Sequence, residues 1–453
     1  MEREQECAGC RELKEQLAKA LERIDQLEKE LEKLKVPPKD SGNSSTPPSQ
    51  DRNRQHYPKR EASGKGSGGQ KGHPGHFHTL SDSPDKVIEC SLPEQCPHCG
   101  CEELNVLEKS LAAIQVVDIP EIKPEVTEYW RQEGQCCSCG KRVKSPLPAG
   151  VKGPVSIGVR ARSLAVYLKN MHALSDKRVV SLFLDWFGLK ISEGWVEKTL
   201  TEKAESLTPT YKAIRESVKT SPVEGSDETG VRINGKGGYI WIFQNPRHVY
   251  FKTAFSRAFK VVEETLGASF KGTHVSDRYG GQLKLESNYK QYCLAHIIRE
   301  CRYLEQTSGC AFATTLKTAL VEAMYFRREQ GETYNPQECR DTIHYAENKL
   351  AACFAHPPPD EDAYKKSRTL FKSLKDKQDC LLRFLHDPQV PPTNNDSERP
   401  LRHVALLRKV FGGFRTLEGA QRYDVFLSVI QSAKRQGLNV LHVLQGKTQL
   451  AFS

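Results

Sequence analysis

A short polar stretch late in the chain, residues 394–402, holds side chains suited to metal and phosphate chemistry. Its asparagines and aspartate are residues that commonly cap helix N-termini, and apolar residues recur at helical spacing from Leu401 onward. Glu398 should therefore lie in the first helical turn, where its carboxylate could hold a metal ion. Basic residues follow it on the same helix and could contact phosphate groups: Arg399, Arg402, His403, Arg408 and Lys409. One carboxylate does not make a metal site, so further acids must lie nearby in the fold.

Two acids upstream are candidate partners for Glu398. Asp227 precedes two β-like runs, Tyr239–Phe243 and His248–Thr253, which are joined by a turn. Asp277 ends a short β-branched run that stops at a glycine pair. Strand, hairpin, helix and strand, with an acid on each outer strand and a third acid on a late helix, is the order of a ribonuclease-H-like core. If the acid-bearing strands pair, the three carboxylates converge, and oxygen ligands favour Mg²⁺ or Mn²⁺ over Zn²⁺.

The chain resembles the insertion-sequence-66 family of DDE transposases over nearly its whole length. Several motifs carry the resemblance and stand in the right order: residues 41–49, 68–75, 227–230, 276–281 and 394–402. The resemblance implies a catalytic triad of Asp227, Asp277 and Glu398, which would hold two Mg²⁺ (or Mn²⁺) ions.

The chemistry that follows from this resemblance is metal-dependent phosphoryl transfer on DNA. Water attack at the terminal inverted repeats of a transposon frees a 3′-hydroxyl, which then attacks target DNA in strand transfer. Arg399 and Arg402 would neutralise charge on the scissile phosphate, and Lys409 is a further candidate DNA-phosphate contact. Family members typically travel with two small accessory proteins. Two other functions fit the same residues: a non-catalytic zinc-containing DNA-binding protein, and a nuclease without strand transfer.

Each acid also has an ordinary structural explanation. Asp227 could cap a turn, and Asp277 could close an Asx turn at a strand end. Glu398 could interact with the helix dipole or pair with Arg402 one turn later. The neighbouring acids most easily confused with the ligands are Glu228 and Asp396.

Length, charge and cysteine content bound the class of protein. The 453 residues suffice for roughly two to four domains, at ~150 residues each. A formal charge of +10 and a pI near 8.8 suggest a polyanionic partner such as DNA. No apolar run reaches the ~18 residues of a membrane span, and 15 cysteines without a secretory signal indicate reduced thiols and metal binding. We therefore expect a cytoplasmic protein with no membrane partner, and the family resemblance implies a bacterial, nucleoid-associated one.

The N-terminal residues predict a helix followed by a linker. A heptad pattern in residues 10–35 predicts a coiled-coil helix over residues 1–36 that joins protomers into a homo-oligomer, although one amphipathic helix packed on its own chain would show the same pattern. Residues 37–85 are basic and rich in Pro, Ser and Gly. This composition predicts a disordered linker, either a plain spacer or a tether that contacts DNA phosphates. Cys7 and Cys10 form an isolated CxxC pair that could hold zinc.

Residues 86–146 predict a zinc-binding, ribbon-like domain. Two CxxC-Gly knuckles would supply the ligands of a structural Zn²⁺: Cys96, Cys99, Cys136 and Cys139. Alternating segments at residues 114–119 and 126–130 could form a hairpin between the knuckles. Cys137 makes the second knuckle ambiguous, and buried structural cysteines are the alternative explanation for the whole set.

Residues 147–220 are helical and basic. A periodic segment at residues 179–186, a glycine-bearing turn and a second helix capped at Ser192 form a pattern typical of a helix-turn-helix DNA-binding region. An ordinary helical hairpin would look the same.

The remaining residues complete a multidomain α+β protein. The predicted parts are a ribonuclease-H-like α/β catalytic core at residues 221–299 and 391–440, an all-helical insertion at residues 300–390 and a tail at residues 441–453. Near the end of the first core segment, Cys293 and His296 could chelate a metal ion, orient a phosphate, or pack between a strand and a helix.

Overall fold

The computed structural model describes residues 16–17, 19, 21–27, 79–105, 114–148, 150–151 and 153–452. They belong to two compact units, one of residues 56–125 and one of residues 1–55 with 126–453. Residues 16–17, 19 and 21–27 are helical. The rest of the predicted coiled coil, Cys7 and Cys10, and the predicted linker up to residue 78 lie outside the described residues. The structure is mixed α/β, in agreement with the predicted α+β class.

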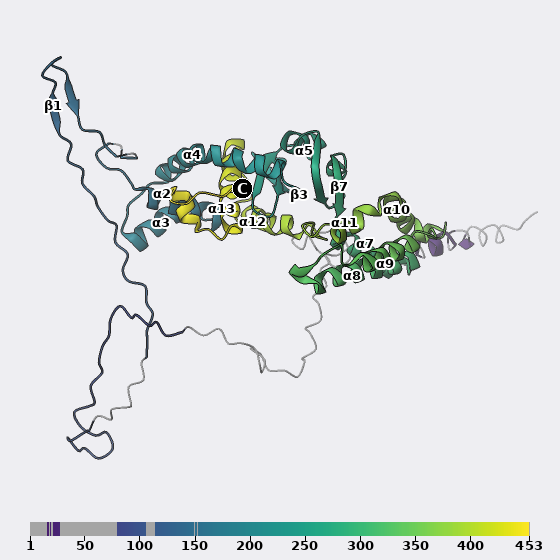
Figure 1. Ribbon diagram of the computed structural model, residues 1–453, viewed down its shortest axis with the longest axis horizontal. Coiled ribbons are helices and arrows are strands. Elements are labelled where there is room, and N and C mark those ends of the chain that lie inside the picture. The colour runs from purple at the N-terminus through teal and green to yellow at the C-terminus, as the bar shows by residue number, and fades with distance from the viewer. Residues whose placement is uncertain are drawn as a thin grey trace, which may run out of the picture. The chain divides into compact units, whose positions relative to one another are not determined.

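A five-stranded mixed sheet forms the centre of the unit that ends at residue 453 (Figure 1). Its strands are β3 (Val223–Ile233), β4 (Lys236–Gln244), β5 (Val249–Ala254), β6 (Ser269–Ser276) and β7 (Glu286–Tyr292), in the order β5-β4-β3-β6-β7. The first three strands are antiparallel, whereas β6 and β7 run parallel to β3. Asn234 and Gly235 join β3 to β4 with φ values of 48° and 72°, the positive angles that a tight hairpin turn requires.

Helices cover both faces of the sheet because the side chains of β4 alternate between them. Trp241 and Phe243 pack into one apolar cluster together with α2 (Val159–Met171), α3 (Asp176–Phe187), α4 (Glu193–Lys219) and α5 (Phe259–Leu266). Ile240 and Ile242 pack on the other face against α12 (Asn395–Phe411). Helix α13 (Leu417–Arg435) contributes to both clusters.

The helical pair predicted from residues 179–186 and Ser192 is confirmed. Helix α3 ends at Gly188, whose φ is 63°, and the Ser192 side chain caps α4 by accepting from Trp195 N. Both helices pack on the sheet as part of its apolar cluster.

Five helices fill the interval between β7 and α12. They are α7 (Leu294–Ser308), α8 (Ala311–Glu329), α9 (Arg340–Cys353), α10 (Lys365–Leu374) and α11 (Asp379–His386). They lie together at the β7 end of the sheet (Figure 1) and share one apolar cluster, to which Leu316, Phe371 and Leu381 belong. None of the described helices combines the length and apolar character needed to cross a bilayer.

Two expectations need correction. Residues 114–130 are all described and contain no strand, so the hairpin predicted there is wrong. Apolar side chains of this segment such as Val116 and Trp130 are about nine-tenths exposed, so they do not pack against a second strand. The hairpin instead consists of β1 (Glu133–Gln135) and β2 (Arg142–Lys144), on either side of the second knuckle. The segment expected to be a plain tail includes the short helix α14 (Val440–Gln445), whose Val443 and Leu444 are buried.

Candidate active site

Two of the three candidate acids lie at the same level of neighbouring parallel strands. Strands β3 and β6 pair with Gly225 opposite Val275. Asp227 and Asp277 each follow two residues later, Asp227 within β3 and Asp277 directly after the end of β6. Because every second residue of a strand points to the same face of the sheet, Asp227 and Asp277 point to the same face as Gly225 and Val275. The predicted position of Asp277 at a strand end is confirmed.

Asp227 and its neighbour Glu228 point to opposite faces of the sheet. Asp227 pairs across the ladder with Ile242, whose side chain packs on the α12 face, whereas Glu228 pairs with Trp241 on the other face. The Glu228 side chain is only 1% exposed and accepts hydrogen bonds from Arg257 Nε at 2.6 Å and Gln282 Nε2 at 2.8 Å. Its carboxylate is therefore already engaged by the protein, and Asp227 is the acid directed toward α12.

Glu398 lies in the first turn of α12, as predicted, and a polar latch fixes the start of that helix on β3. Asn394 Nδ2 donates to Ser226 O at 2.7 Å, Ser397 Oγ donates to Asn394 Oδ1 at 2.6 Å, and Gln244 Nε2 donates to Ser397 Oγ at 3.0 Å. Gly225 leaves the room for this contact, because a Cβ atom there would lie only 3.0–3.1 Å from the latch atoms. We call Gly225, Ser226, Gln244, Asn394 and Ser397 the α12 latch.

The latch corrects one detail of the sequence prediction. Asn394 is the N-cap residue of α12, but its side chain makes no capping hydrogen bond to the helix. The side chain is occupied by Ser226 and Ser397 instead, so docking the helix on the sheet takes precedence over capping it.

Cys293 connects the start of α7 to the end of β6 and to the start of α12. Its backbone N–H donates to Ser276 O at 2.8 Å, and its buried Sγ accepts from Asn394 N at 3.2 Å. The end of β6, the start of α7 and the start of α12 are thus held together next to Asp277 and Glu398. Cys293 thus packs between a strand and a helix, one of the alternatives predicted for it, and it also belongs to the group of potential metal ligands described next.

Two side chains of α7, His296 and Arg299, lie close to Glu398. His296 Nδ1 lies 3.9 Å and Arg299 Nη2 lies 3.8 Å from Glu398 Oε1. Among the residues that the structure describes, the ligand atoms of Cys293, His296 and Glu398 all lie within 4.8 Å of one another. The sequence singled out His296 only as one member of a CxxH pair, and its nearness to Glu398 depends on the docking of α7 beside α12.

The electrostatics of the site are those of crowded carboxylates. Burial raises the pKa of Asp227 well above its ordinary value, and repulsion from Asp277, Glu228 and Glu398 raises it further. A hydrogen bond from Glu228 N to Asp227 Oδ1, at 2.8 Å, acts in the opposite direction. Asp227 therefore retains its proton more readily than an ordinary aspartate unless a cation compensates its charge.

The loop that carries Asp277 has an unusual backbone. Asp277 Oδ1 accepts from Tyr279 N at 3.0 Å, which is the Asx turn offered above as an alternative explanation. Arg278 between them has a φ of 69°, a left-handed conformation that side chains rarely adopt, and its Nη2 donates to Glu300 at 2.5 Å. Arg257 lies 3.6 Å over the Tyr279 ring. The turn orients Asp277 without using both of its oxygens, so it is compatible with metal binding.

The candidate phosphate contacts Arg399, Arg402 and Lys409 all lie on α12 and are exposed. Arg399 is 76% exposed in its side chain and has only a 4.0 Å ion pair with Asp396. It lines a pocket of 610 Å³ together with Lys434, Arg435 and residues of the α12 latch. Asp396, which is 57% exposed, belongs to this pocket and ion pair, so it is not directed toward Asp227.

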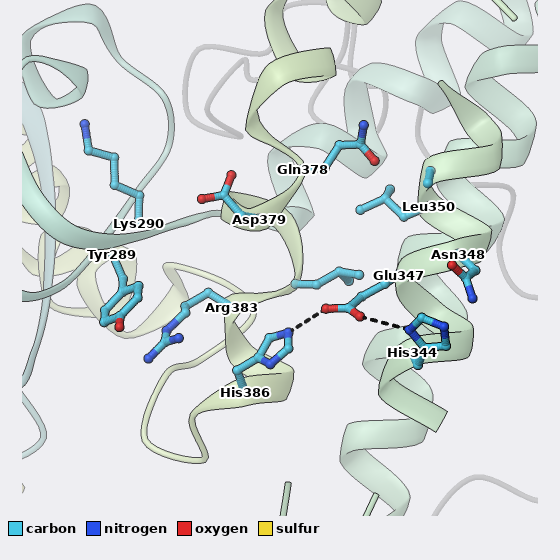
Figure 2. Close-up of a pocket in the computed structure, with 12 residues that line it drawn as sticks. Tyr289, Lys290, His344, Glu347, Asn348, Leu350, Gln378, Asp379, Arg383 and His386 are labelled. Atoms are coloured by element: carbon cyan, nitrogen blue, oxygen red, sulfur yellow. Dashed lines mark ion pairs between the residues drawn. The ribbon is translucent and has the colours of Figure 1, made fainter. Parts of the chain in front are cut away.

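A second pocket, of 480 Å³, lies between β7, α9 and α11 (Figure 2). Glu347 forms ion pairs with His386 at 3.0 Å and with His344 at 3.7 Å, and Arg383 stacks 3.6 Å over Tyr289. Glu347 and Asp379 offset the charge of Lys290 and Arg383 here. This pocket contains none of the three candidate acids.

Both predicted zinc knuckles have the same backbone. Cys96 N donates to Cys101 O at 2.8 Å and Gly100 N to Cys96 O at 2.8 Å, and the equivalent bonds link Cys136 with Lys141 and Gly140 at 2.9 Å. The two glycines have φ values of 75° and 68°. Backbone N–H groups within each knuckle lower the pKa values of the Cys96 and Cys136 thiols, which favours the thiolates that zinc requires.

The comparisons with known proteins assign the family. Residues 154–422, which include the sheet, the three acids and His296, match the model described as Transposase IS66 family, and the chain belongs to this family. The resemblance drawn from the motifs is thereby confirmed. Residues 2–79 match a family of unknown function, DUF6444.

One curated relative is the uncharacterized protein y4jO of Sinorhizobium fredii (strain NBRC 101917 / NGR234). It is 32% identical over 81 residues, which cover 18% of this chain and 25% of the relative. The chain thus matches about a quarter of the length of that protein.

Proposed function

We propose that the protein is a DDE transposase that cleaves DNA at transposon ends and joins them to target DNA. The observation that supports this most directly is the level placement of Asp227 within β3 and of Asp277 directly after β6, with Glu398 at the start of α12, which the latch holds on β3. Three antiparallel strands followed by two parallel ones, with acids on β3, after β6 and on a late helix, agree with a ribonuclease-H-like core. Helices α7 to α11 would then be its all-helical insertion.

The donor set fits divalent cations. All three candidate ligands are carboxylates, Asp227 is crowded by like charge, and Glu398 Oε1 is buried without a hydrogen-bond partner among the described residues. Asp227, Asp277 and Glu398 would hold the cations, whose charge would favour the ionised form of Asp227. Bound Mg²⁺ or Mn²⁺ would activate the attacking oxygen and stabilise the leaving one. Because Glu398 lies on a separate helix, the α12 latch determines how close its carboxylate comes to Asp227 and Asp277.

The DNA would follow the basic residues that surround the start of α12. Arg399 and Arg402 are close to Glu398 in sequence and exposed, and Arg399, Lys434 and Arg435 face only one carboxylate, Asp396, in their pocket. These cations would bind the phosphates next to the cleaved bond. The helices α3 and α4 are proposed as a further DNA-binding region, with Trp186 exposed at their turn.

The remaining modules have supporting roles in this proposal. Each knuckle, Cys96 with Cys99 and Cys136 with Cys139, provides a pair of ligands for structural zinc. The N-terminal helix joins protomers, since Leu17, Leu21 and Ile24 are at least half exposed. Accessory proteins of the same element would act with this chain at the DNA ends.

A strand-transfer assay tests the proposal. The purified full chain is incubated with labelled terminal repeats of its own element, a target plasmid and Mg²⁺. We expect Mg²⁺-dependent end cleavage and joined products, and Asp227→Asn should abolish both while end binding stays near normal. Cleavage without joining would identify a nuclease, and end binding without any cleavage would identify a non-catalytic DNA-binding protein. Either result contradicts the proposal.

A further inference from the structure

Two buried polar atoms face each other across the candidate site without touching. His296 Nδ1 and Glu398 Oε1 are both buried, neither has a hydrogen-bond partner among the described residues, and 3.9 Å separates them. A hydrogen bond between nitrogen and oxygen needs about 2.7–3.2 Å. Leaving a buried donor or acceptor without a partner destabilises the folded chain. A movement of about 1 Å by the Glu398 carboxylate would satisfy both atoms.

Arg299 favours one of the two tautomers of His296. Arg299 Nη2 lies 3.5 Å from His296 Nε2, a long contact, while Arg299 Nε donates to Ala295 O at 3.2 Å on the same helix. A guanidinium has donors only, so its position beside Nε2 favours the form in which Nε2 carries no hydrogen. In the neutral ring the hydrogen is then on Nδ1, the atom that faces Glu398.

This tautomer distinguishes a hydrogen-bond donor from a metal ligand. Cys293, His296 and Glu398 also have the spacing of a metal site, and in the tautomer with the hydrogen on Nδ1 the nitrogen that faces Glu398 is a donor rather than a ligand. Cys293 Sγ accepts a hydrogen bond from Asn394 N at 3.2 Å. That bond fixes the start of α7 beside the start of α12 and so sets the distance between His296 and Glu398.

We propose that His296 is a positioning residue for the metal-binding carboxylate of Glu398. With Glu398 as a ligand of a divalent cation, its Oε1 would accept a hydrogen bond from His296 Nδ1, and Arg299 beside Nε2 favours the tautomer that donates from Nδ1. A metal-bound carboxylate held by a hydrogen bond keeps its orientation and loses less freedom on binding. This role rests on the proposed function, because it requires Glu398 to be a metal ligand.

Mn²⁺ binding to the DNA-free full chain, followed by the electron paramagnetic resonance signal of the free ion, tests this role. Loss of the hydrogen bond in His296→Ala should weaken Mn²⁺ binding by about 10- to 100-fold. In His296→Asn the amide nitrogen takes the place of Nδ1, and we expect an affinity within about threefold of wild type. In His296→Gln the amide nitrogen takes the place of Nε2, so affinity should stay as low as in the alanine variant.

The matched pair of amide variants separates donation from packing. A purely structural role predicts equal Mn²⁺ affinities for His296→Asn and His296→Gln, and this result would overturn the inference, as would wild-type affinity in His296→Ala. Asp227→Asn distinguishes this failure from failure of the proposed function. If Asp227→Asn keeps wild-type Mn²⁺ affinity, the acid site itself is refuted. If it loses binding while His296→Ala retains it, only the role of His296 is refuted.

Discussion

Asp227 and Glu228 are adjacent in β3, yet one faces α12 and the other is buried on the opposite face against Arg257. Two neighbouring acids therefore have different tasks. Asp227 is left with carboxylates around it and one backbone hydrogen bond, which suits a cation ligand. Glu228 instead anchors Arg257, which stacks on Tyr279 in the Asp277 loop.

Substitution of these two acids should separate chemistry from stability. Asp227→Asn should reduce DNA cleavage by about 10³-fold or more, because a charge-stabilising group at the reacting centre is lost. Glu228→Gln should leave Mn²⁺ affinity within about threefold but lower the free energy of unfolding by about 1–2 kcal/mol, since it weakens the charge-assisted hydrogen bond between the buried Glu228 carboxylate and the partly exposed Arg257. Urea unfolding and Mn²⁺ titration of both variants are the measurements. Equal loss of Mn²⁺ binding in both would show that Glu228 is also a ligand.

The α12 latch predicts a specific effect of Gly225→Ala. The new Cβ would lie 3.0 Å from Gln244 Nε2 and from Ser397 Oγ, so these latch side chains must shift by a few tenths of an ångström, which strains the docking of α12 on β3. We expect a loss of about 1–3 kcal/mol in stability and a clear drop in Mn²⁺ affinity, because Glu398 moves with the helix. Gly230→Ala is the matched control in the same strand, where no atom lies within 4 Å of the added Cβ. If both variants bind Mn²⁺ equally well, the latch does not position Glu398.

Much of this arrangement could be predicted from sequence because it depends on local patterns. The turn at Asn245, the strand end at Asp277 and the helical turn that contains Glu398 follow from turn residues and apolar periodicity. The contacts that align them could not be predicted, since they join residues far apart in the chain. Gln244 bonds to Ser397, 153 positions away, and Cys293 to Asn394, 101 positions away.

A buried pair of residues, Glu224 and His274, could not be predicted from the sequence for the same reason. Glu224 and His274 are partners across β3 and β6, with His274 Nδ1 at 2.6 Å from Glu224 Oε2, and both are fully buried. Burial raises the pKa of Glu224, and His274 opposes this shift. The available signal was one ionisable residue in each of two predicted strands, Glu224 and His274, followed three positions later by Asp227 and Asp277, and only the register shows that the first two meet.

The second knuckle yields a test of which cysteines bind zinc. The Cys136 thiol lies in the hydrogen-bonded turn with its pKa lowered by the N–H groups of Cys139 and Ser138, whereas Cys137 is exposed. Cys136→Ser should therefore reduce the zinc content of the purified protein, and Cys137→Ser should leave it unchanged. Elemental analysis of both proteins after dialysis provides the readout. Zinc loss in Cys137→Ser with retention in Cys136→Ser would reverse the assignment.

His248 should make folding stability depend on pH below neutrality. Its ring lies between Ser217 Oγ at 2.9 Å and Gln436 Nε2 at 3.1 Å and stacks on Phe452, and burial lowers its pKa to about 4. Above pH ~6.5 the ring is neutral in the folded and the unfolded chain, so it costs nothing. As the pH falls from ~6.5 toward 4, only the unfolded chain takes up the proton, and stability is lost.

The size of this loss can be isolated by a difference measurement. At pH 4.5 it should be on the order of 2 kcal/mol relative to pH 7.5. Buried Asp424, whose pKa burial raises to about 7, acts with the opposite sign, because the folded chain holds its proton over the pH range in which the unfolded chain has released it. Urea unfolding of wild type and His248→Gln at both pH values cancels that contribution. The stability difference between the two proteins should shrink at pH 4.5, and a difference that does not change with pH would show that His248 is protonated in the folded state.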